Sequence, residues 1–566
     1  MDLILYNGII HTMNGGEVVS AIAVENGLIT LVGTDAEILA LKTADTKMVD
    51  LKQRLAIPGF NDSHLHVLSY GVQKSILNLT GCTSVAEIVN RGREYIAGNP
   101  VIKLVYGRGW NQDYFSDHVM PTKSDLDGIS REIPIVFSRV CGHSAVANTA
   151  ALAYYGIDEN TKPPEGGGID FEKGHFSENA LGLLGSSTLS TSEMKAFLED
   201  AMSDMVKRGV TSAQSDDFGY APYEDVIAVY NELANNGKMP LRVTQQCNIS
   251  DIDGIRGFIA YANAHANALG ERGDSGIDGG GCSSGGGNLS KCSSGSLRCN
   301  SNKQNDTSAF FRLGPIKLLA DGSLGARTAL MSQPYNDDAT TSGIACYTQP
   351  ELDEIVEFCH KNDWPVAVHC IGDKAWRMVA ESVEKAQKAH AARPRHGIVH
   401  CQISDMPMLK KMKELDLLAY VQPIFLDYDL HIVEQRVGPE LASTSYNFKT
   451  LYDLGVHVAL GTDCPVERFD PLANIYCAVT RKDLNGFPDD GFYSNQALTV
   501  QEAVYCYTCG AAYCSYEERV KGRLEKGYYA DITVIDRDIF SIAPMEIKDA
   551  NVLMTITGGK IVYDQT

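Results

Sequence analysis

Short apolar stretches alternate with helix-length segments through the middle of this chain, and this alternation limits the fold more than any other feature. Segments 351–363 and 406–415 have the length of helices and lie between apolar stretches. Strands that alternate with helices form parallel βαβ units. Eight stretches are typical of buried strands: residues 55–62, 209–217, 240–247, 314–322, 364–373, 396–403, 416–423 and 457–466. Eight such units predict an α/β fold with a TIM-like (β/α)₈ barrel over residues 55–517.

Both ends of the chain follow a different pattern. Residues 3–35 are typical of short strands separated by Asn- and Gly-containing turns, and the strand-like segments of the last 40 or so residues repeat this pattern. Two separate β pieces would explain this. A single small β-sandwich built from both termini, residues 1–54 and 518–566, is more economical, because the termini of a domain often lie close together.

Two regions interrupt the alternation. Residues 72–206 fall between the first two predicted strands and are too long for one crossover, so they predict an inserted α+β subdomain. Residues 270–308 are dominated by Gly and Ser, with almost nothing to bury, and predict a disordered surface insertion. The insertion contains Cys282, Cys292 and Cys299, whose spacing matches no usual zinc pattern. A disulfide or metal cross-link there is the alternative.

Composition excludes some classes of partner. The net charge of -22 argues against a nucleic-acid surface or an anionic membrane as partner, since both need clustered basic residues. The chain shows no signal peptide and no run of about 18 apolar residues. Its 15 cysteines are interpreted mainly as buried, reduced thiols of a cytoplasmic protein. A small-molecule substrate is expected, with a homodimer as the simplest assembly.

Residues able to bind a metal stand near the carboxyl ends of several predicted strands, which open on the active-site face of a parallel barrel. Within a strand, residues i and i+2 point the same way, so His64 and His66 can bind one ion together. The set comprises His64, His66, Lys317, His369, His400 and Asp463. A lone histidine is more often a satisfied core residue, and His11, His265, His390 and His431 are interpreted that way. The set as a whole predicts a divalent metal site, because imidazoles and carboxylates suit zinc and similar ions.

Six motifs, in this order, resemble those of the amidohydrolase superfamily. They are PGFNDSHLH, KLLADGSLGARTA, VAVHCIGDKA, GIVHC, LGTDCPV and GRLEKGYYADITVID. The resemblance covers nearly the whole chain apart from 270–308. Two further segments, GRGWNQDYF and RVCGHSAVAN, are similar to motifs of the YtcJ-like (amidohydrolase 3) branch, which includes N-substituted formamide deformylases. The branch often has a tryptophan where this chain has Cys464.

The resemblance implies a role for each residue of the metal set. His64, His66 and Asp463 would hold one divalent metal, with zinc as the expected ion, and His369 and His400 a second. A carboxylated Lys317 would bridge them. Burial disfavours the charged form of a lysine, and the free amine can then add carbon dioxide. The alternative is an unmodified Lys317 paired to Asp321, with one metal per chain.

The implied activity is hydrolysis of a non-peptide carbon–nitrogen bond, of amide or N-formyl type, in a small molecule. Metal-activated hydroxide would attack the carbonyl carbon, and Asp463 would carry its proton to the leaving nitrogen. As an alternative, Asp463 is a passive ligand. Three other functions remain open: a mononuclear deaminase of the same superfamily, a phosphotriesterase-like enzyme, and a catalytically silent binding protein.

The residues that contact the substrate are less constrained. Trp110 and His143 are candidates from the branch resemblance alone, with core packing as the alternative, and Arg327 is a third candidate. Four acidic residues have ambiguous roles as supporting, capping or pocket residues: Asp62, Glu178, Asp321 and Asp373.

Overall fold

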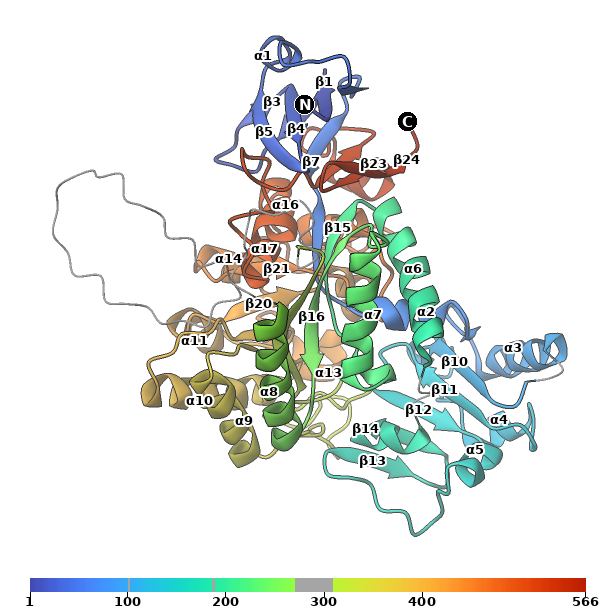
Figure 1. Ribbon diagram of the computed structural model, residues 1–566. Coiled ribbons are helices and arrows are strands. Elements are labelled where there is room, and N and C mark those ends of the chain that lie inside the picture. Colours follow the sequence, from blue (N-terminus) through green and yellow to red (C-terminus); the bar gives the residue numbers. More distant parts are fainter. Residues whose placement is uncertain (100–101, 186–188, 270–308) are drawn as a thin grey trace.

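Eight parallel strands form the centre of the computed structural model, which describes residues 1–99, 102–185, 189–269 and 309–566 (Figure 1). In chain order they are β8 (Phe60–Leu65), β15 (Val210–Ser215), β16 (Arg242–Asn248), β17 (Phe311–Leu319), β18 (Val366–Cys370), β19 (Gly397–His400), β20 (Leu418–Val421) and β21 (Val458–Leu460). Each strand pairs in parallel with the next along the chain. The predicted α/β barrel class is confirmed.

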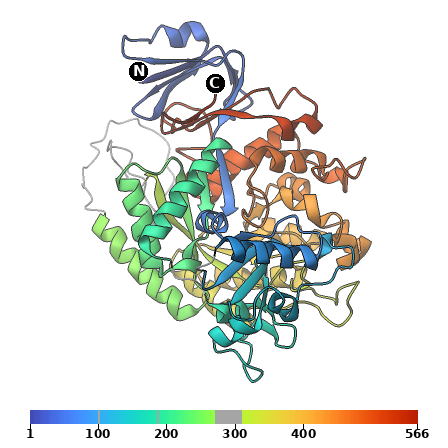
Figure 2. The same cartoon turned by 90° about the vertical axis from the view of Figure 1, so that its right-hand side faces the viewer.

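Helices follow the strands and cover the outside of the barrel (Figure 2). They include α6 (Thr191–Lys207), α7 (Tyr223–Asn235), α8 (Ile252–Leu269), α9 (Gln349–Lys361), α10 (Asp373–Ala389), α11 (Met406–Glu414), α13 (Val433–Ala442), α14 (Phe448–Asp453), α15 (Pro471–Thr480) and α16 (Val500–Tyr505). Their buried faces carry apolar residues such as Met202, Val229 and Val379, which pack in the main hydrophobic core. Burial of these faces stabilises the helices more than their intrinsic propensity does.

The first and last barrel strands stand at the two ends of the sheet order. Backbone hydrogen bonds beyond the strand ends join them: the N–H of Asp463 donates to the carbonyl of His64 at 2.8 Å, and the N–H of His66 donates to that of Cys464 at 2.8 Å. We call this junction the seam. It brings into contact residues that are far apart in the sequence.

Two further sheets are built from the ends of the chain, the first from N-terminal strands alone and the second from strands of both ends. One has the order β5 (Leu28–Gly33), β4 (Ala21–Glu25), β1 (Leu3–Tyr6) and β6 (Lys47–Asp50). The other has the order β24 (Lys560–Asp564), β23 (Val552–Thr557), β22 (Ile532–Ile535), β7 (Leu55–Pro58), β2 (Ile9–His11) and β3 (Val18–Val19). Apolar residues of both ends, among them Leu5, Ile22 and Ile532, share one core. The two termini lie close together in Figure 1.

The stretch that the sequence presents as one first strand is divided between two sheets. Leu55–Pro58 forms β7 and pairs with β2 and β22, whereas the barrel strand β8 begins at Phe60. The chain changes sheet at Gly59, where a Cβ atom would lie 2.1 Å from Thr211 Oγ1. Only a glycine permits so close an approach. The expected start of the barrel at residue 55 is therefore corrected to residue 60.

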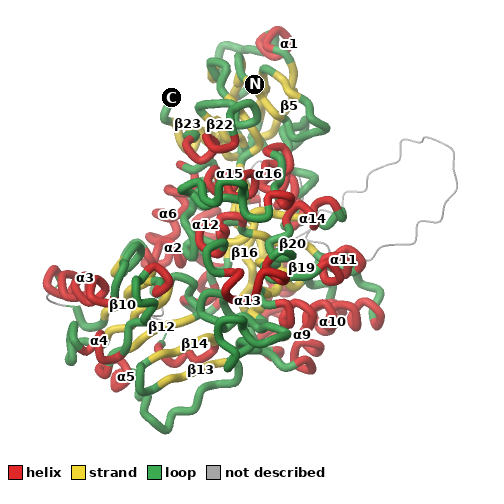
Figure 3. The backbone as a smooth tube through the Cα atoms, turned by 180° about the vertical axis from the view of Figure 1, so that it is seen from behind, coloured by secondary structure: helices red, strands yellow, loops and turns green. Residues whose placement is uncertain are grey.

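Between β8 and β15 the chain forms a mixed six-stranded sheet beside the barrel (Figures 1 and 3). Its order is β13 (Gly167–Asp170), β14 (His175–Glu178), β12 (Ser144–Ala147), β11 (Ile135–Arg139), β10 (Val105–Trp110) and β9 (Leu77–Asn78). The helices α3 (Val85–Gly98), α4 (Lys123–Asp127) and α5 (Thr149–Tyr154) belong to the same segment, and α2 (Val67–Gln73) precedes them and packs against α6. We call this segment the inserted subdomain.

Three expectations concern other parts of the chain. The Gly/Ser-rich segment 270–308 and its three cysteines lie outside the described residues. Every cysteine of the described part is a free thiol, and all but Cys141 are buried. Among the described helices, none is long and apolar enough to cross a membrane.

Candidate metal centre

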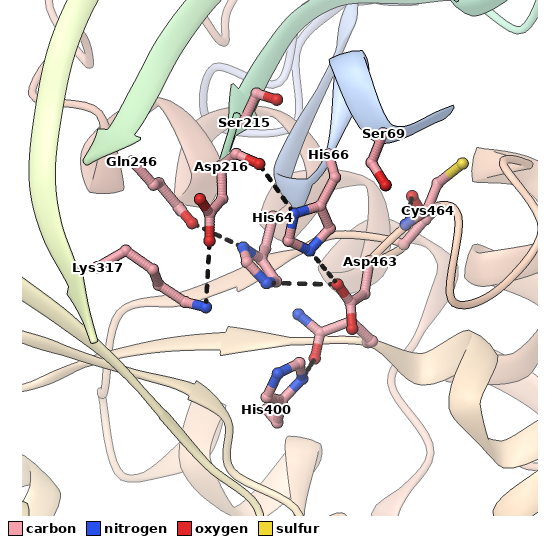
Figure 4. Close-up of polar contacts among 12 residues, drawn as sticks. His64, His66, Ser69, Ser215, Asp216, Gln246, Lys317, His400, Asp463 and Cys464 are labelled. Atoms are coloured by element: carbon pink, nitrogen blue, oxygen red, sulfur yellow. Dashed lines mark hydrogen bonds and ion pairs between the residues drawn. The ribbon is translucent and has the colours of Figure 1, made fainter. Parts of the chain in front are cut away.

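His64, His66 and Asp463 meet at the seam of the barrel. The two imidazole Nε2 atoms lie 3.4 Å and 3.1 Å from the same carboxylate oxygen, Asp463 Oδ1. In the described part of the chain this is the one group of three potential ligands whose atoms all lie within 4.8 Å of one another. Figure 4 shows both rings directed at the carboxylate. Strand parity turns the two histidines to the same side, and the seam supplies Asp463.

Hydrogen bonds at the far side of each ring fix which nitrogen faces Asp463. The Nδ1 atom of His66 lies 2.9 Å from the Asp216 carbonyl oxygen, which can only accept. The Nδ1 atom of His64 lies 2.6 Å from Gln246 Oε1, whose amide nitrogen donates to the Ser63 carbonyl. Both Nδ1 atoms therefore donate, and in each neutral ring the Nε2 lone pair faces Asp463. A group of acceptors so close together requires a cation between them.

His400 and His369 extend the group. The His400 ring lies 5.5 Å from His64 and 4.4 Å from His369, centroid to centroid. Its Nδ1 atom donates to Gln422 Oε1 at 2.9 Å, which leaves Nε2 as a lone pair. His369 is held the other way round: its Nε2 donates to the Gly322 carbonyl at 3.1 Å, so Nδ1 is free to coordinate.

Lys317 is buried beside this group and faces Asp216. Its Nζ atom lies 3.7 Å from Asp216 Oδ2, and only 2% of its side chain is exposed. The alternative partner, Asp321, accepts instead from the backbone N–H groups of Leu330, Ile371 and Gly372. The sequence argument did not select Asp216. Its position directly after the second barrel strand is a signal that could have found it, as for the other residues at strand ends.

The charges of the group favour cation binding. Burial lowers the pKa of His64 well below its ordinary value, and Lys317 lowers it further. Burial lowers the pKa of His400 to about 4. Burial opposes ionisation of Asp463, but the hydrogen bond from His66 and the other imidazoles hold its pKa well below the usual range. Burial opposes a charge on His66, but the contact with Asp463 raises its pKa.

Comparison with known proteins gives the family. The amidohydrolase family profile matches residues 47–563, almost the whole chain. The chain belongs to the amidohydrolase family. This amidohydrolase is similar to YtcJ of Bacillus subtilis (30% identity, 100% of each chain) and to the N-substituted formamide deformylase of Arthrobacter pascens (23% identity, 100% of this chain and 99% of the relative).

A solved structure agrees over nearly the same length. An uncharacterized metal-dependent hydrolase from Pyrococcus horikoshii is 26% identical, with a TM-score of 0.70 over 96% of this chain and 99% of that one. The amidohydrolase superfamily is metal-dependent. The residues present fit a metal, because four imidazoles each have one nitrogen donating to a carbonyl oxygen and the other left as a ligand.

The three predicted substrate residues of this amidohydrolase lie in different surroundings. Trp110 has no exposed surface: it packs in the core of the inserted subdomain, and its indole N–H donates to the Phe137 carbonyl at 3.1 Å. It therefore stabilises the subdomain and offers no surface to a substrate. Arg327 makes two hydrogen bonds to Asp337, at 3.1 and 2.9 Å, and its contact with a substrate stays a prediction.

His143 does reach the group of histidines. Its ring centroid lies 4.8 Å from that of His369, and its Nδ1 atom lies 2.7 Å from Glu178 Oε2. Burial opposes a charge on His143, but Glu178 raises its pKa to about 9.

Two of the ambiguous acidic residues support loops. Asp373 begins α10 and accepts from the Ser332 backbone N–H at 2.8 Å, so it holds the loop that contains Ser332. Asp62 is fully buried and faces Thr462 at the seam.

Proposed function

We propose that this amidohydrolase cleaves a non-peptide carbon–nitrogen bond, of amide or N-formyl type, in a small molecule. One observation carries the proposal: four imidazoles and the Asp463 carboxylate present coordinating atoms to one small region, while the other nitrogen of each imidazole is held by a hydrogen bond. Such a donor set suits zinc. Similarity along the full chain to a protein named N-substituted formamide deformylase supports this bond type.

We assign the ligands as follows. His64, His66 and Asp463 would hold one divalent ion, and His369 and His400 would hold a second. Lys317 lies beside both sets and, if carboxylated, would bridge them. When bound, the metal supplies the Lewis acidity that activates water and polarises a carbonyl group.

The chain's own residues supply the proton transfers and the orientation. Asp463 uses Oδ1 to face His64 and His66, and among the described residues no hydrogen bond ends on Oδ2. Its Oδ2 atom is therefore placed to accept a proton from the attacking water and deliver it to the leaving nitrogen. Gln246 holds the His64 ring, which fixes the direction of its ligand atom.

A mononuclear deaminase is the second candidate, and one observation favours it. His64, His66 and Asp463 lie within ligand distance of one another, whereas no further residue of the described chain joins that group. If only this triad binds metal, the protein would hold one ion per chain. A deaminase of this kind would release ammonia from an aminated carbon.

Metal counting coupled to a substrate screen tests the proposal. Purified protein is analysed for metal per chain and assayed with N-formyl and N-acyl compounds, aminated heterocycles and phosphate triesters. Release of formate or acetate together with a free amine is the expected result. Ammonia release with one metal per chain would favour the deaminase, and turnover of triesters alone would favour the phosphotriesterase-like activity. Metal-replete protein without any turnover would favour a binding protein.

A further inference from the structure

His143 and Glu178 stand opposite each other where two strands of the inserted subdomain end. β12 and β14 pair antiparallel with Ser144 opposite Ser177, so His143, which precedes Ser144, and Glu178, which follows Ser177, lie at the same end of the ladder. The backbone N–H of Glu178 continues the ladder by donating to the His143 carbonyl at 3.1 Å. The pairing of the two strands therefore places the backbones of His143 and Glu178 opposite each other, independently of their side chains.

The side chains form a pair with one atom left over. His143 Nδ1 donates to Glu178 Oε2 at 2.7 Å, and the Glu178 side chain is only 2% exposed. Its second oxygen, Oε1, is buried and has no hydrogen-bond partner among the described residues. A buried polar atom without a partner costs free energy, on the order of 1–3 kcal/mol. This unpartnered atom indicates that a ligand belongs nearby.

The pair crosses from the inserted subdomain to the barrel. The rings of His143 and His369 are in contact, with centroids 4.8 Å apart. A Cβ atom at Gly322 would lie 2.1 Å from Glu178 Oε1, so Glu178 rests on bare backbone. That same Gly322 supplies the carbonyl that orients His369. The side chains of Glu178 and His369 therefore both contact Gly322.

The remaining nitrogen of His143 is unused. Its Nδ1 is taken by Glu178, no protein group of the described residues binds Nε2, and 14% of the side chain is exposed. A ring that is held at one nitrogen, adjoins a proposed metal ligand and has its other nitrogen free is suited to contact a substrate.

We propose that His143 is the substrate-binding residue of the inserted subdomain, contacting the polar atom of an acyl or formyl group through Nε2, and that Glu178 positions it. The identity of that group as the acyl part of an amide rests on the proposed function. The contact itself requires only a carbonyl-type ligand beside His369.

Acetohydroxamic acid is a suitable probe, because it is a small chelating analogue of an acyl group and its binding does not require turnover. We would measure its dissociation constant, by calorimetry, with zinc-loaded protein and with four variants. They are His143→Gln, Glu178→Gln, Glu178→Ala and His175→Gln. His175 is the matched control, since it lies on β14 but its Nε2 contacts the Pro121 carbonyl instead of the barrel.

We expect His143→Gln and Glu178→Ala to weaken binding at least 10-fold, with unchanged zinc content. Glu178→Gln retains an oxygen that accepts from Nδ1, so its loss should be smaller than that of Glu178→Ala. This graded rescue separates positioning from mere folding, and the melting temperature of each variant checks folding. His175→Gln should bind as the wild type does.

Several outcomes would overturn the proposal. These are wild-type affinity in zinc-loaded His143→Gln, an equal loss in His175→Gln, or no binding of the probe to the zinc-loaded wild type. If the wild type binds the probe but cleaves no amide, the proposed function is rejected. The role of His143 is then judged from the binding of the probe to the variants alone.

Discussion

Asp62 on the first barrel strand accepts two hydrogen bonds from Thr462, which follows the last strand. The Thr462 backbone N–H donates to Oδ1 at 3.1 Å, and its hydroxyl donates to Oδ2 at 2.8 Å. Tyr507 donates a third, at 2.9 Å. A Cβ at Gly461 would lie 2.6 Å from the backbone nitrogen of His64, so the two chain segments are in close contact. The hydrogen bonds of Asp62 therefore stabilise the seam, and the seam sets the separation of His64 and Asp463.

The first prediction follows from this arrangement. Asp62→Ala removes these three acceptor contacts and a fourth, from the His64 backbone N–H at 3.3 Å, so zinc affinity should fall about 10–100-fold, as for other residues that orient ligands. Competition with a coloured chelator measures it. Asp253→Ala is the control, because the Asp253 side chain is 85% exposed on α8. Unchanged zinc affinity in Asp62→Ala would show that the seam does not hold the ligands in place.

A second prediction concerns Gln246. Gln246→Leu keeps the volume but removes the oxygen that accepts from His64 Nδ1. The ring loses its fixed tautomer, and zinc affinity should again fall about 10–100-fold. Gln245→Leu is a matched control with the same side chain and burial on the adjacent position of β16, where side chains alternate in direction. Equal losses in the two variants would assign the effect to general disruption of the strand.

The third prediction separates ligand from proton carrier. Asp463→Asn keeps one oxygen toward His64 and His66 but cannot take up a proton. We expect a loss of most turnover, about 100-fold or more, with part of the bound metal retained. Turnover and metal content are measured on the same preparation. Near-normal turnover in metal-loaded Asp463→Asn would leave Asp463 only a passive ligand.

The sequence predicts those parts of this fold that depend on local pattern. The count of barrel strands follows from apolar stretches separated by helix-length segments, and the shared direction of His64 and His66 follows from strand parity. The division at Gly59 was missed, because two strands of different sheets form one continuous apolar stretch. The Pro58–Gly59 pair was the available signal.

Contacts between distant segments could not be predicted in the same way. Gln246 and Gln422 have no sequence feature that marks them as holding a histidine, since an amide on a buried strand is compatible with many partners. Trp110 shows the converse: a motif suggested a substrate contact, but its burial depends on how the subdomain packs. The side chain of Glu178 reaches Gly322 only because the inserted subdomain packs against the barrel, and local pattern does not give that packing.

A fourth prediction concerns Lys317, whose Nζ lies 3.7 Å from Asp216 in a nearly closed environment. In fully metallated protein incubated with ¹³C-bicarbonate, we expect a carbamate ¹³C signal that is absent in Lys317→Ala. The variant should lose one metal, and added propionate should restore it by supplying a carboxylate in the vacated space. Lys74→Ala, which changes a more exposed lysine, is the control. Two bound metals with an unmodified Lys317 would contradict carboxylation and require another bridging group.

The last prediction concerns pH and lies away from the metal centre. His396 is 1% exposed, accepts from the Val366 backbone N–H through Nδ1, and lies 2.9 Å from His360 Nδ1 through Nε2. Burial, and secondarily His360, lowers the pKa of His396 to about 3. An unfolded histidine has a pKa of about 6.5. Below about pH 6.5 the unfolded chain therefore binds a proton that the folded chain does not, and stability falls until about pH 3.

His396→Asn tests this, because the Asn oxygen takes the place of Nδ1 as acceptor for Val366 but does not titrate. Urea unfolding at pH 7.5, 6 and 5 gives the free energy of unfolding of both proteins. Between pH 6 and 5 the wild type should lose up to about 1.4 kcal/mol more per pH unit than the variant. The other titratable groups are common to both proteins, so the difference isolates His396. The control is His431→Asn, at a more exposed histidine paired to Asp483. In this variant the free energy of unfolding should fall with pH as steeply as in the wild type. Parallel curves for wild type and His396→Asn would show that His396 is protonated in the folded state as readily as in the unfolded chain.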